Sequence, residues 1–322
     1  MSEDLGPKAE RLAQKYGYLP YMVERYLSFL GAEETLKMLE ANEKPLPSTL
    51  RVNSLKIETD VLRKRLEKKG FKLEPLLWLD YGFRILNEPL NLGSLHEFLQ
   101  GHYYLQNVAS MLPPIILNPR PGETLVDMCA SPGGKSTHLA QIMENQGRLI
   151  LIEKNRKRLR ALDLNLRRMG VQNSVLYHMD AIQLSKLKLK ADKILLDAPC
   201  TGEGLIREDP SRKISRTPQD LERLSQVQKQ LLTAGLAELK IGGKLLYCTC
   251  SIAPEENELV IQKVLKNKPQ YQISPIDKAY GVPGLTKVYG KSLIPELKQS
   301  RRIYPHKHDT IGFFMCLVEK IK

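Results

Sequence analysis

The sequence predicts an α/β protein whose larger part is a mostly parallel sheet with helices on both faces. From about residue 104 onward, strand-like apolar runs alternate with helical patterns, which is typical of such a sheet. A glycine-containing loop follows the first run, and acidic residues end several others. The last two runs, 301–305 and 312–319, predict a closing antiparallel pair.

Positive charge dominates the composition. The 322 residues include 49 Lys and Arg against 36 Asp and Glu, a net charge of +13. Such a surplus favours a nucleic-acid partner, although a lysine-rich solvated surface would give the same count. The sequence shows no signal peptide and no long apolar run, so we expect a cytoplasmic protein that does not enter a membrane.

The five cysteines predict neither a zinc site nor a disulfide framework. No Cys-x-x-Cys pair occurs, and an odd number of cysteines in a cytoplasmic protein argues against paired disulfides. Three of them fall at or just beyond predicted strand ends, where α/β proteins build active sites. We therefore expect cysteine chemistry and no metal.

Two smaller units precede the main sheet. Residues 1–44 carry apolar residues at helical spacing and predict helices that pack on, or extend, the next unit. Residues 45–104 predict a small α/β domain with strands at 49–55, 71–76 and 83–86 and a helix at 59–69. RNA binding and a merely solvated helix face explain its basic residues about equally well: Arg51, Lys56, Arg63, Lys64, Arg65, Lys68, Lys69 and Lys72.

The glycine loop lies in TLVDMCASPGGKST, residues 124–137. A strand, a glycine turn and a helix N-terminus together present backbone N–H groups to a ligand. Gly134, Lys135 and Ser136 match the end of a triphosphate-binding loop, but Cys129 stands where that pattern requires glycine. The alternative ligand is a nucleoside cofactor such as S-adenosylmethionine.

Acids at successive strand ends favour the nucleoside cofactor. Strands at 148–153, 175–180 and 193–197 end in Glu153, Asp180 and Asp197. Glu153 can accept hydrogen bonds from ribose hydroxyls, and Asp180 can accept one from an adenine amino group. A nucleotide triphosphatase could use Asp197 for magnesium, but it would leave the other two acids without a task.

The remaining elements continue the alternation. Asn155 can cap a helix that ends before Gly170, and Thr217 can cap one that lasts to about Lys240. Between them, a polar loop at 201–217 carries basic residues. A strand at 244–250 and a helix that opens at Pro254 follow.

Cys200 and Cys250 end two strands that we expect to be neighbours. A thiolate that adds to carbon-6 of cytosine turns carbon-5 into a nucleophile, which can attack a sulfonium methyl group. A nearby carboxylic acid that donates to ring N3 would stabilise the adduct, and a second cysteine could assist release. Cys316 and Cys248 fit the simpler description of buried apolar residues.

Four segments together resemble the NOP/Sun (Fmu-type) family of RNA cytosine-5 methyltransferases. They are DMCASPGGKST at 127–137, LLDAPCTGEG at 195–204, LLYCTCSIAPEENE at 245–258 and RRIYPHKHDTIGFFM at 301–315. The resemblance implies a Rossmann-like class I methyltransferase domain over 105–322, which uses S-adenosyl-L-methionine. It also implies a small RRM-like RNA-binding domain over 45–104.

The resemblance implies a role for individual residues. Cys250 would be the nucleophile, Cys200 would help to release the methylated RNA, and Asp197 would face both the cytosine and the methyl donor. DNA cytosine methyltransferases instead take their nucleophile from the element that holds Cys200. The cofactor would be held by Cys129, Ala130, Ser131, Pro132, Gly133, Gly134, Lys135, Glu153, Asp180 and Asp197, with Arg158 as a weaker candidate.

Transfer RNA is the expected substrate, and ribosomal RNA is the alternative. No PUA-like extension follows Lys322, so substrate choice should rest on residues 1–104 and the basic loop at 207–216. This compact form resembles archaeal-type members that act on tRNA, and we expect a monomer. Asn107 stands where the family often has an acid, and we assign it no role. A non-catalytic RNA-binding protein would have lost Cys250 or the glycine loop, and neither is lost.

Overall fold

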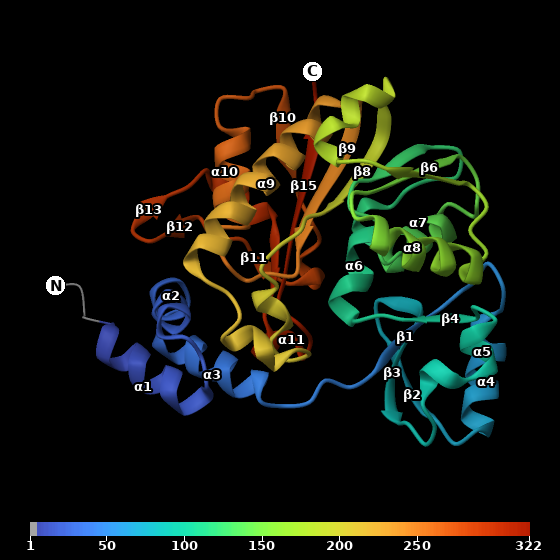
Figure 1. Cartoon of the computed structure of the whole chain (residues 1–322), viewed down its shortest axis with the longest axis horizontal. Coiled ribbons are helices and arrows are strands. Elements are labelled where there is room, and N and C mark those ends of the chain that lie inside the picture. Colours follow the sequence, from blue (N-terminus) through green and yellow to red (C-terminus); the bar gives the residue numbers. More distant parts are fainter. Residues whose placement is uncertain (1–4) are drawn as a thin grey trace.

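The computed structural model describes residues 5–322, and in this part of the chain the strands form sheets of nine, four and two strands (Figure 1). N-terminal helices lie at one end of the molecule, and an extended segment connects them to the four-stranded sheet. The nine-stranded sheet lies above both. No helix within residues 5–322 has the length and apolar character needed to cross a bilayer.

The N-terminal helices are α1 (Gly6–Tyr16), α2 (Pro20–Leu30) and α3 (Ala32–Asn42). Pro20 begins α2 at a position where its missing N–H costs nothing, and Gly17 ends α1 with a φ of +74°. Apolar residues of these helices form one cluster with Ile206, Ile252 and Tyr304 of the large unit. Our prediction that they pack on the small unit is therefore wrong, because their apolar partners belong to loops of the nine-stranded sheet.

The four-stranded sheet is antiparallel, in the order β2-β3-β1-β4, and its chain order is β-α-β-β-α-β. Leu50, Leu62, Leu66 and Phe83 are fully or almost fully buried in its core. The elements are β1 (Thr49–Val52), α4 (Thr59–Lys68), β2 (Lys72–Leu76), β3 (Leu79–Asn87), α5 (His96–Leu99) and β4 (Tyr103–Leu105).

Arg51 corrects one sequence-based expectation for this unit. Its side chain is fully buried and donates hydrogen bonds to Gln141, to Thr137 Oγ1 at 2.9 Å and to Gln106 Oε1 at 3.2 Å. Thr137 and Gln141 belong to α7 (Gly134–Ile142) of the large unit. Arg51 therefore joins the two units and is not available to RNA.

The nine-stranded sheet has the order β11-β14-β15-β9-β8-β5-β6-β7, and β10 pairs with β15. Strands β5 to β9 are parallel to one another, whereas β10, β11, β14 and β15 pair in antiparallel fashion. Strands β14 and β15 confirm the predicted antiparallel pair. The strands are β5 (Thr124–Asp127), β6 (Arg148–Glu153), β7 (Ser174–His178), β8 (Ala191–Asp197), β9 (Leu239–Thr249), β10 (Tyr271–Ser274), β11 (Val282–Pro283), β14 (Arg301–Ile303) and β15 (Phe313–Lys320). The two-stranded sheet pairs β12 (Lys287–Val288) with β13 (Lys291–Ser292).

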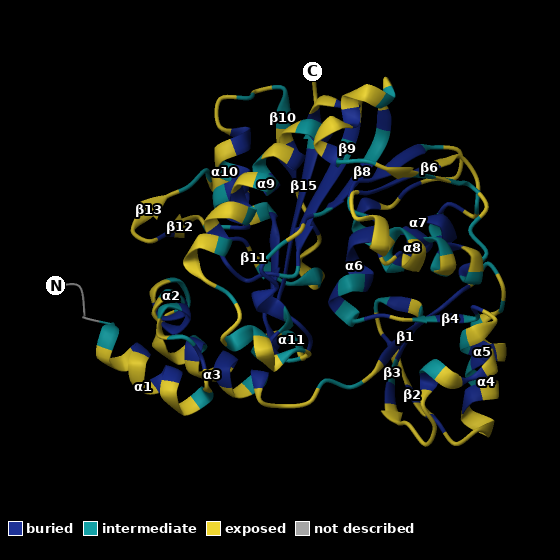
Figure 2. Ribbon diagram, viewed as in Figure 1, coloured by how far each residue is buried: buried dark blue, intermediate teal, exposed yellow. Residues whose placement is uncertain are grey.

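Helices cover both faces of this sheet, which confirms the predicted fold class. Successive strand residues point to opposite faces, so Leu195 lies in one core cluster and Leu196 in the other. Strands β5, β6 and β15 are buried along most of their length (Figure 2), whereas the edge strand β7 is largely exposed. The helices of this unit are α6 (Val108–Leu117), α7, α8 (Arg156–Met169), α9 (Pro218–Ala237), α10 (Glu258–Leu265) and α11 (Pro305–His308).

Several predicted boundaries shift. Strand β9 begins at Leu239, so Gly242 and Gly243 lie within the strand, which we predicted to start after them. Strand β7 ends at His178, and Asp180 caps a following 3₁₀ turn by accepting a hydrogen bond from Ile182 N. Helix α10 begins four residues after Pro254. The 3₁₀ segments are Leu92–Ser94, Ala181–Leu187, Glu203–Leu205, Pro210–Lys213, Lys278–Tyr280 and Pro295–Gln299.

Candidate active site

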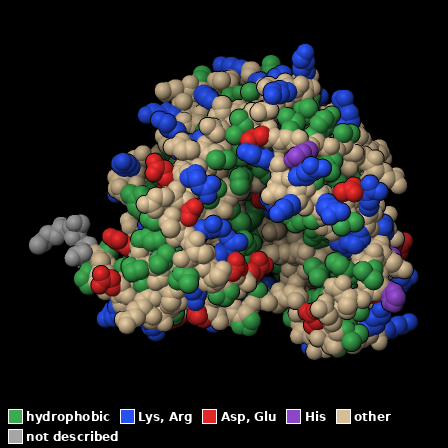
Figure 3. All heavy atoms as spheres, in the orientation of Figure 1, with side chains coloured by type: hydrophobic (Ala, Val, Ile, Leu, Met, Phe, Trp, Pro, Cys, Tyr) green, Lys and Arg blue, Asp and Glu red, His purple; other side chains and the backbone are tan. Residues whose placement is uncertain are grey.

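A cavity of about 900 Å³ opens at the carboxyl ends of the parallel strands. Ligands of open α/β sheets bind in this place, because the strand order reverses on either side of the first strand. Figure 3 shows a hollow in this face with Lys and Arg side chains along its rim. The lining includes many of the predicted residues: Cys129, Ser131, Glu153, Arg158, Asp180, Asp197, Cys200 and Cys250.

The glycine loop joins β5 to α7 around a buried carboxyl group. Asp127 accepts hydrogen bonds from Ser136 Oγ at 2.7 Å and from Cys129 N at 3.3 Å. Burial raises the pKa of Asp127 to about 7, although these hydrogen bonds act in the opposite direction. Gly133 has a φ of +106°, which a residue with a side chain rarely adopts. Gly133 therefore allows the tight turn after β5, and residues of this turn line the cavities.

Arg158 holds the loop in place from α8. Its Nη2 donates to Ser131 O at 2.6 Å, and Ser131 Oγ donates to Arg158 O at 3.0 Å. Its Nη1 also lies 3.7 Å from Glu153 Oε2. Arg158 thus contacts the loop and Glu153 directly, in addition to lining the cavity.

The acids that end β6 and follow β7 lie on one side of the cavity. Glu153 is buried, and its Oε1 accepts from Asn155 N at 2.7 Å. Asp180 pairs with Lys154 Nζ at 2.6 Å. Burial alone would raise the pKa of Asp180, but the hydrogen bonds from Lys154 and Ile182 N lower it overall. Asp180 is therefore ionised at neutral pH and can accept a hydrogen bond from a ligand.

Asp197 and Lys135 form an ion pair between this cavity and a smaller one. Lys135 Nζ lies 2.7 Å from Asp197 Oδ2, and Cys248 Sγ lies 3.5 Å from Oδ1. Burial lowers the pKa of Lys135, but the Asp197 carboxylate, together with Cys248 and Cys250, raises it overall. The pair therefore presents a fixed donor next to a fixed acceptor. The smaller cavity, of about 300 Å³, is lined by Ala130, Pro132, Gly134, Lys135, Asp197 and Asn107 among others.

Asn107 has a structural task. Its Oδ1 accepts from Ala109 N at 3.0 Å, which caps α6, and from Thr310 Oγ1 at 2.7 Å. Its Nδ2 donates to Glu208 Oε1 at 3.1 Å. An aspartate at this position would place its carboxylate next to that of Glu208, whereas the amide of Asn107 can donate to Glu208.

Cys200 and Cys250 meet at the ends of neighbouring strands β8 and β9. Asp197 of β8 is paired with Cys248 of β9. Cys200 lies three residues after Asp197, and Cys250 lies two residues after Cys248. Their sulfur atoms are 3.1 Å apart. The hydrogen bond to Cys250, together with burial, raises the pKa of Cys200. Cys200 therefore keeps its proton at neutral pH. Cys248 and Cys316 are fully buried.

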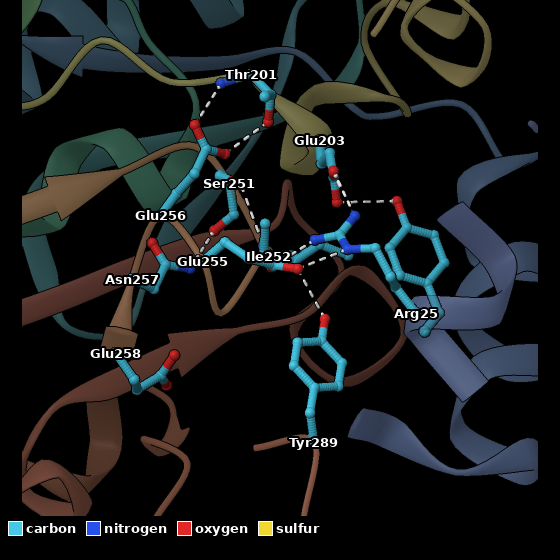
Figure 4. Close-up of polar contacts among 12 residues, drawn as sticks. Arg25, Thr201, Glu203, Ser251, Ile252, Glu255, Glu256, Asn257, Glu258 and Tyr289 are labelled. Carbon is cyan, nitrogen blue, oxygen red and sulfur yellow. Dashed lines mark hydrogen bonds and ion pairs between the residues drawn. The ribbon is translucent and has the colours of Figure 1, made fainter. Parts of the chain in front are cut away.

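Glu256 is a site residue that the sequence analysis missed. Its buried carboxylate accepts from Thr201 N at 2.8 Å and Thr201 Oγ1 at 2.6 Å (Figure 4). It also accepts from Gln228 Nε2 at 3.0 Å. Because Thr201 follows Cys200 and Glu256 lies six residues after Cys250, these bonds tie the two cysteine segments together. The run PEENE gave no sign of this, because acids at a helix start are commonly solvated.

The N-terminal helices reach the same loops. Arg25 of α2 contacts Glu203 Oε1 at 2.8 Å and Glu255 Oε2 at 2.7 Å, and Tyr289 Oη donates to Glu255 at 2.9 Å (Figure 4). Gly204 N donates to Cys250 O at 2.9 Å, and a Cβ at Gly204 would lie only 2.7 Å from that oxygen. The loops after β8 and β9 are therefore packed backbone to backbone.

Two basic residues of the 207–216 loop make hydrogen bonds and ion pairs within the protein. Arg207 donates to Lys44 O at 2.8 Å and pairs with Asp309 at 2.9 Å, and Lys213 pairs with Glu43 at 2.6 Å. The expectation that the whole loop serves substrate choice is wrong for these two.

Within residues 5–322, no group of three or more His, Cys, Asp or Glu side chains is arranged to hold a metal ion.

Family models match nearly the whole chain. Residues 114–319 match the family described as 16S rRNA methyltransferase RsmB/F, and residues 19–108 match the N-terminal domain of 16S rRNA methyltransferase RsmF. The human 28S rRNA (cytosine(4447)-C(5))-methyltransferase is 38% identical over 99% of this chain and 40% of its own length. The tRNA (cytosine(72)-C(5))-methyltransferase of Pyrococcus horikoshii is 38% identical over 72% of this chain and 56% of its own. The chain spans 40% to 51% of the length of the animal and yeast relatives that it matches.

Solved structures agree with the fold. A methyltransferase homolog from Pyrococcus horikoshii superposes with a TM-score of 0.88 at 43% identity and covers 98% of this chain and 99% of its own. NSun6 from the same organism, in a structure with the S-adenosylmethionine analogue SFG, has a TM-score of 0.83 at 28% identity over 93% of this chain and 97% of its own. The chain therefore belongs to the RsmB/F family of S-adenosylmethionine-dependent methyltransferases, the NOP/Sun family that its motifs resemble.

Proposed function

We propose that the protein methylates carbon-5 of cytosine in RNA, through a covalent adduct with Cys250. The observation that carries this proposal is the pair of thiols 3.1 Å apart, beside the Asp197–Lys135 ion pair, in a cavity that also contains Glu153 and Asp180. The printed names of several relatives support it, since they are RNA cytosine-C(5) methyltransferases.

The cavity fits S-adenosylmethionine. Glu153 can accept from the ribose hydroxyls and Asp180 from the adenine amino group, while the loop Cys129–Lys135 with Arg158 can hold the methionine end. When bound, the cofactor supplies an electrophilic methyl group. The buried carboxylate of Glu153 is already oriented by Asn155 N, so little ordering is needed on binding.

The residues of the chain then act on the cytosine. The Cys250 thiolate forms a bond to carbon-6, and the ring electrons shift to carbon-5, which takes the methyl group. Lys135 can donate a proton to ring N3, and Asp197 can accept from the exocyclic amino group. The carbon-5 proton is then lost to solvent, the sulfur–carbon-6 bond breaks to regenerate the thiolate of Cys250, and ring N3 returns its proton to Lys135. The Cys200 thiol, in contact with Cys250, assists this release by donating a hydrogen bond to the departing sulfur.

Incubation with labelled S-adenosylmethionine tests this function. Deproteinised ribosomal RNA and transfer RNA are offered separately, and the modified base is identified by mass spectrometry. We expect 5-methylcytosine in at least one of the two RNAs. A methyl group on another atom, or no transfer to either RNA by a protein that binds the cofactor, would contradict the proposal.

We propose transfer RNA as the substrate, and the relatives give a second candidate. The tRNA methyltransferase of Pyrococcus horikoshii supports tRNA. Ribosomal RNA is favoured by the names of the relatives that match 95% to 99% of this chain. The comparison of the two RNAs above decides between them by the ratio of kcat/KM.

Glu153→Ala should weaken binding of S-adenosylmethionine more than tenfold. Hydrogen bonds to a charged group are worth about 1.5–3 kcal/mol, and about 1.4 kcal/mol corresponds to tenfold in affinity. Titration calorimetry measures the change. Asp163→Ala, which removes an exposed carboxylate of α8 paired with Arg167, is the matched control. An unchanged affinity in Glu153→Ala would remove this residue from the cofactor site.

Glu256→Ala should misplace Cys200. The change leaves the two buried donors of Thr201 without an acceptor, at about 1–3 kcal/mol each, so we expect a lower Tm. Gln228 Nε2 loses one of its two acceptors and keeps Pro199 O. We also expect a covalent protein–RNA species on denaturing gels, because release depends on Cys200. Glu256→Gln keeps one oxygen acceptor and should accumulate less. A lower Tm without any adduct would mean that Glu256 only stabilises the fold.

A further inference from the structure

Two arginines of the 207–216 loop differ from the other basic residues of that segment. Arg212 and Arg216 line the large cavity together with Cys200 and Cys250, whereas Arg207 and Lys213 bind the N-terminal region and α11 or its flank. Because they lie in the same cavity as the thiols, they are positioned to bind an anionic group of a ligand there.

Both guanidinium groups converge on one carbonyl oxygen. Arg212 Nη1 donates to Thr201 O at 2.8 Å, and Arg216 Nε donates to the same oxygen at 3.1 Å. Thr201 directly follows Cys200. Gly202 leaves the space that this arrangement needs, because a Cβ there would collide with Arg212 Nη1. The chain thus builds a two-arginine corner next to the thiols.

The corner carries uncompensated positive charge. Arg212 lies 3.2 Å from Asp209 Oδ2, which offsets one of the two charges. Among residues 5–322, no carboxylate lies within ion-pair distance of Arg216, and only its Nε has a hydrogen-bond partner. Four N–H donors of Arg216 therefore remain for a ligand with several acceptor oxygens.

We propose that Arg212 and Arg216 bind a phosphate group of the RNA strand beside the target cytidine. This inference rests on the proposed function. A base that reaches Cys250 must be turned out of its stack, which brings its flanking phosphates to the mouth of the cavity. The planar guanidinium fork matches phosphate oxygens.

The methionine carboxylate of the cofactor is the other anion of similar chemistry. Glu153 and Asp180 would hold the nucleoside end beyond β6 and β7, and the glycine loop after β5 would hold the methionine end. The arginines belong to the loop that follows β8, on the side of the thiols. This placement favours the phosphate.

The test uses the full chain and measures binding of RNA and of S-adenosylmethionine separately. We expect Arg216→Ala to weaken RNA binding about tenfold and to lower the slope of log K against log salt by about 0.7 to 1, with cofactor affinity unchanged. Arg216→Lys should restore most of the slope but less of the affinity. Arg223→Ala removes an exposed arginine of α9 outside the cavity lining and should change neither quantity.

Three outcomes would overturn the inference. A loss of cofactor affinity with an unchanged salt slope would assign the corner to the cofactor carboxylate. A change in neither quantity would make the arginines a structural cap on Thr201. An equal loss in Arg216→Ala and Arg223→Ala would indicate a general charge effect. Because binding is measured without methyl transfer, an RNA that binds through Arg216 but gains no 5-methylcytosine would contradict the proposed function alone.

Discussion

Cys250→Ala should abolish RNA methylation and leave binding of S-adenosylmethionine intact. Without the thiolate, carbon-5 of cytosine does not become nucleophilic, so we expect a loss of about 10⁴-fold or more, the scale for removal of a covalent nucleophile. Cys250 touches the cavity from the β9 side, away from Glu153 and Asp180, which is why the cofactor should still bind. Single-turnover kinetics with saturating cofactor measure the loss.

Cys200→Ala should behave differently. Cys250 can still add to the base and the methyl group can still transfer, but the group that assists the release of Cys250 from carbon-6 is gone. We expect a covalent protein–RNA species that survives denaturing gels. If the two cysteines were only structural, both variants would lose stability and activity in parallel and neither would form an adduct. If Cys200 were the nucleophile, Cys200→Ala would be inert and free of adduct.

Asp197→Asn should lower the rate of methyl transfer by about 10²- to 10⁴-fold, the range for a group that takes part in proton transfer or stabilises developing charge. The carboxylate faces the cavity and holds Lys135 Nζ at 2.7 Å, so the variant loses an acceptor and frees a buried ammonium group. Asp180→Asn is the control, since it should weaken cofactor binding with little effect on the rate at saturation. A fully active Asp197→Asn would remove the ion pair from the mechanism.

The same variant should change the pH dependence. Burial lowers the pKa of Lys135, and the Asp197 carboxylate is the first of the neighbouring groups that raise it. Asp197→Asn removes the second effect, so the pKa of Lys135 should fall. The residual activity of the variant should then decline at a lower alkaline pH than the activity of the parent, because the protonated ammonium is the form that donates. An unchanged alkaline limit would argue that Lys135 transfers no proton.

The sheet and the strand-end residues were predictable from the sequence. In a parallel sheet the carboxyl ends meet at one edge, so acids and cysteines that end successive apolar runs had to share a site. The contact between Cys200 and Cys250 follows from the adjacency of β8 and β9, which the register of Asp197 with Cys248 sets in detail. The spacing of apolar residues therefore predicts both the order of strands and helices and the contact between the two thiols.

The supporting contacts were not predictable, because they depend on side chains far apart in the chain. Glu256 reads as a solvated acid at a helix start until Thr201 and Gln228 are placed beside it. Arg51 reads as surface charge in a basic domain, but it is buried against α7. The amphipathic pattern of α2 shows that one face is covered and does not show by what, so its packing on Ile206 and Ile252 was missed.

The covalent role of Cys250 is tested most directly by mass spectrometry of the adduct. Cys200→Ala is incubated with substrate RNA and S-adenosylmethionine, then digested with ribonuclease and protease. We expect a methylated cytidine nucleotide attached to the peptide that carries Cys250, and no adduct in Cys250→Ala. An adduct on any other cysteine, or one that forms in Cys250→Ala, would contradict the account.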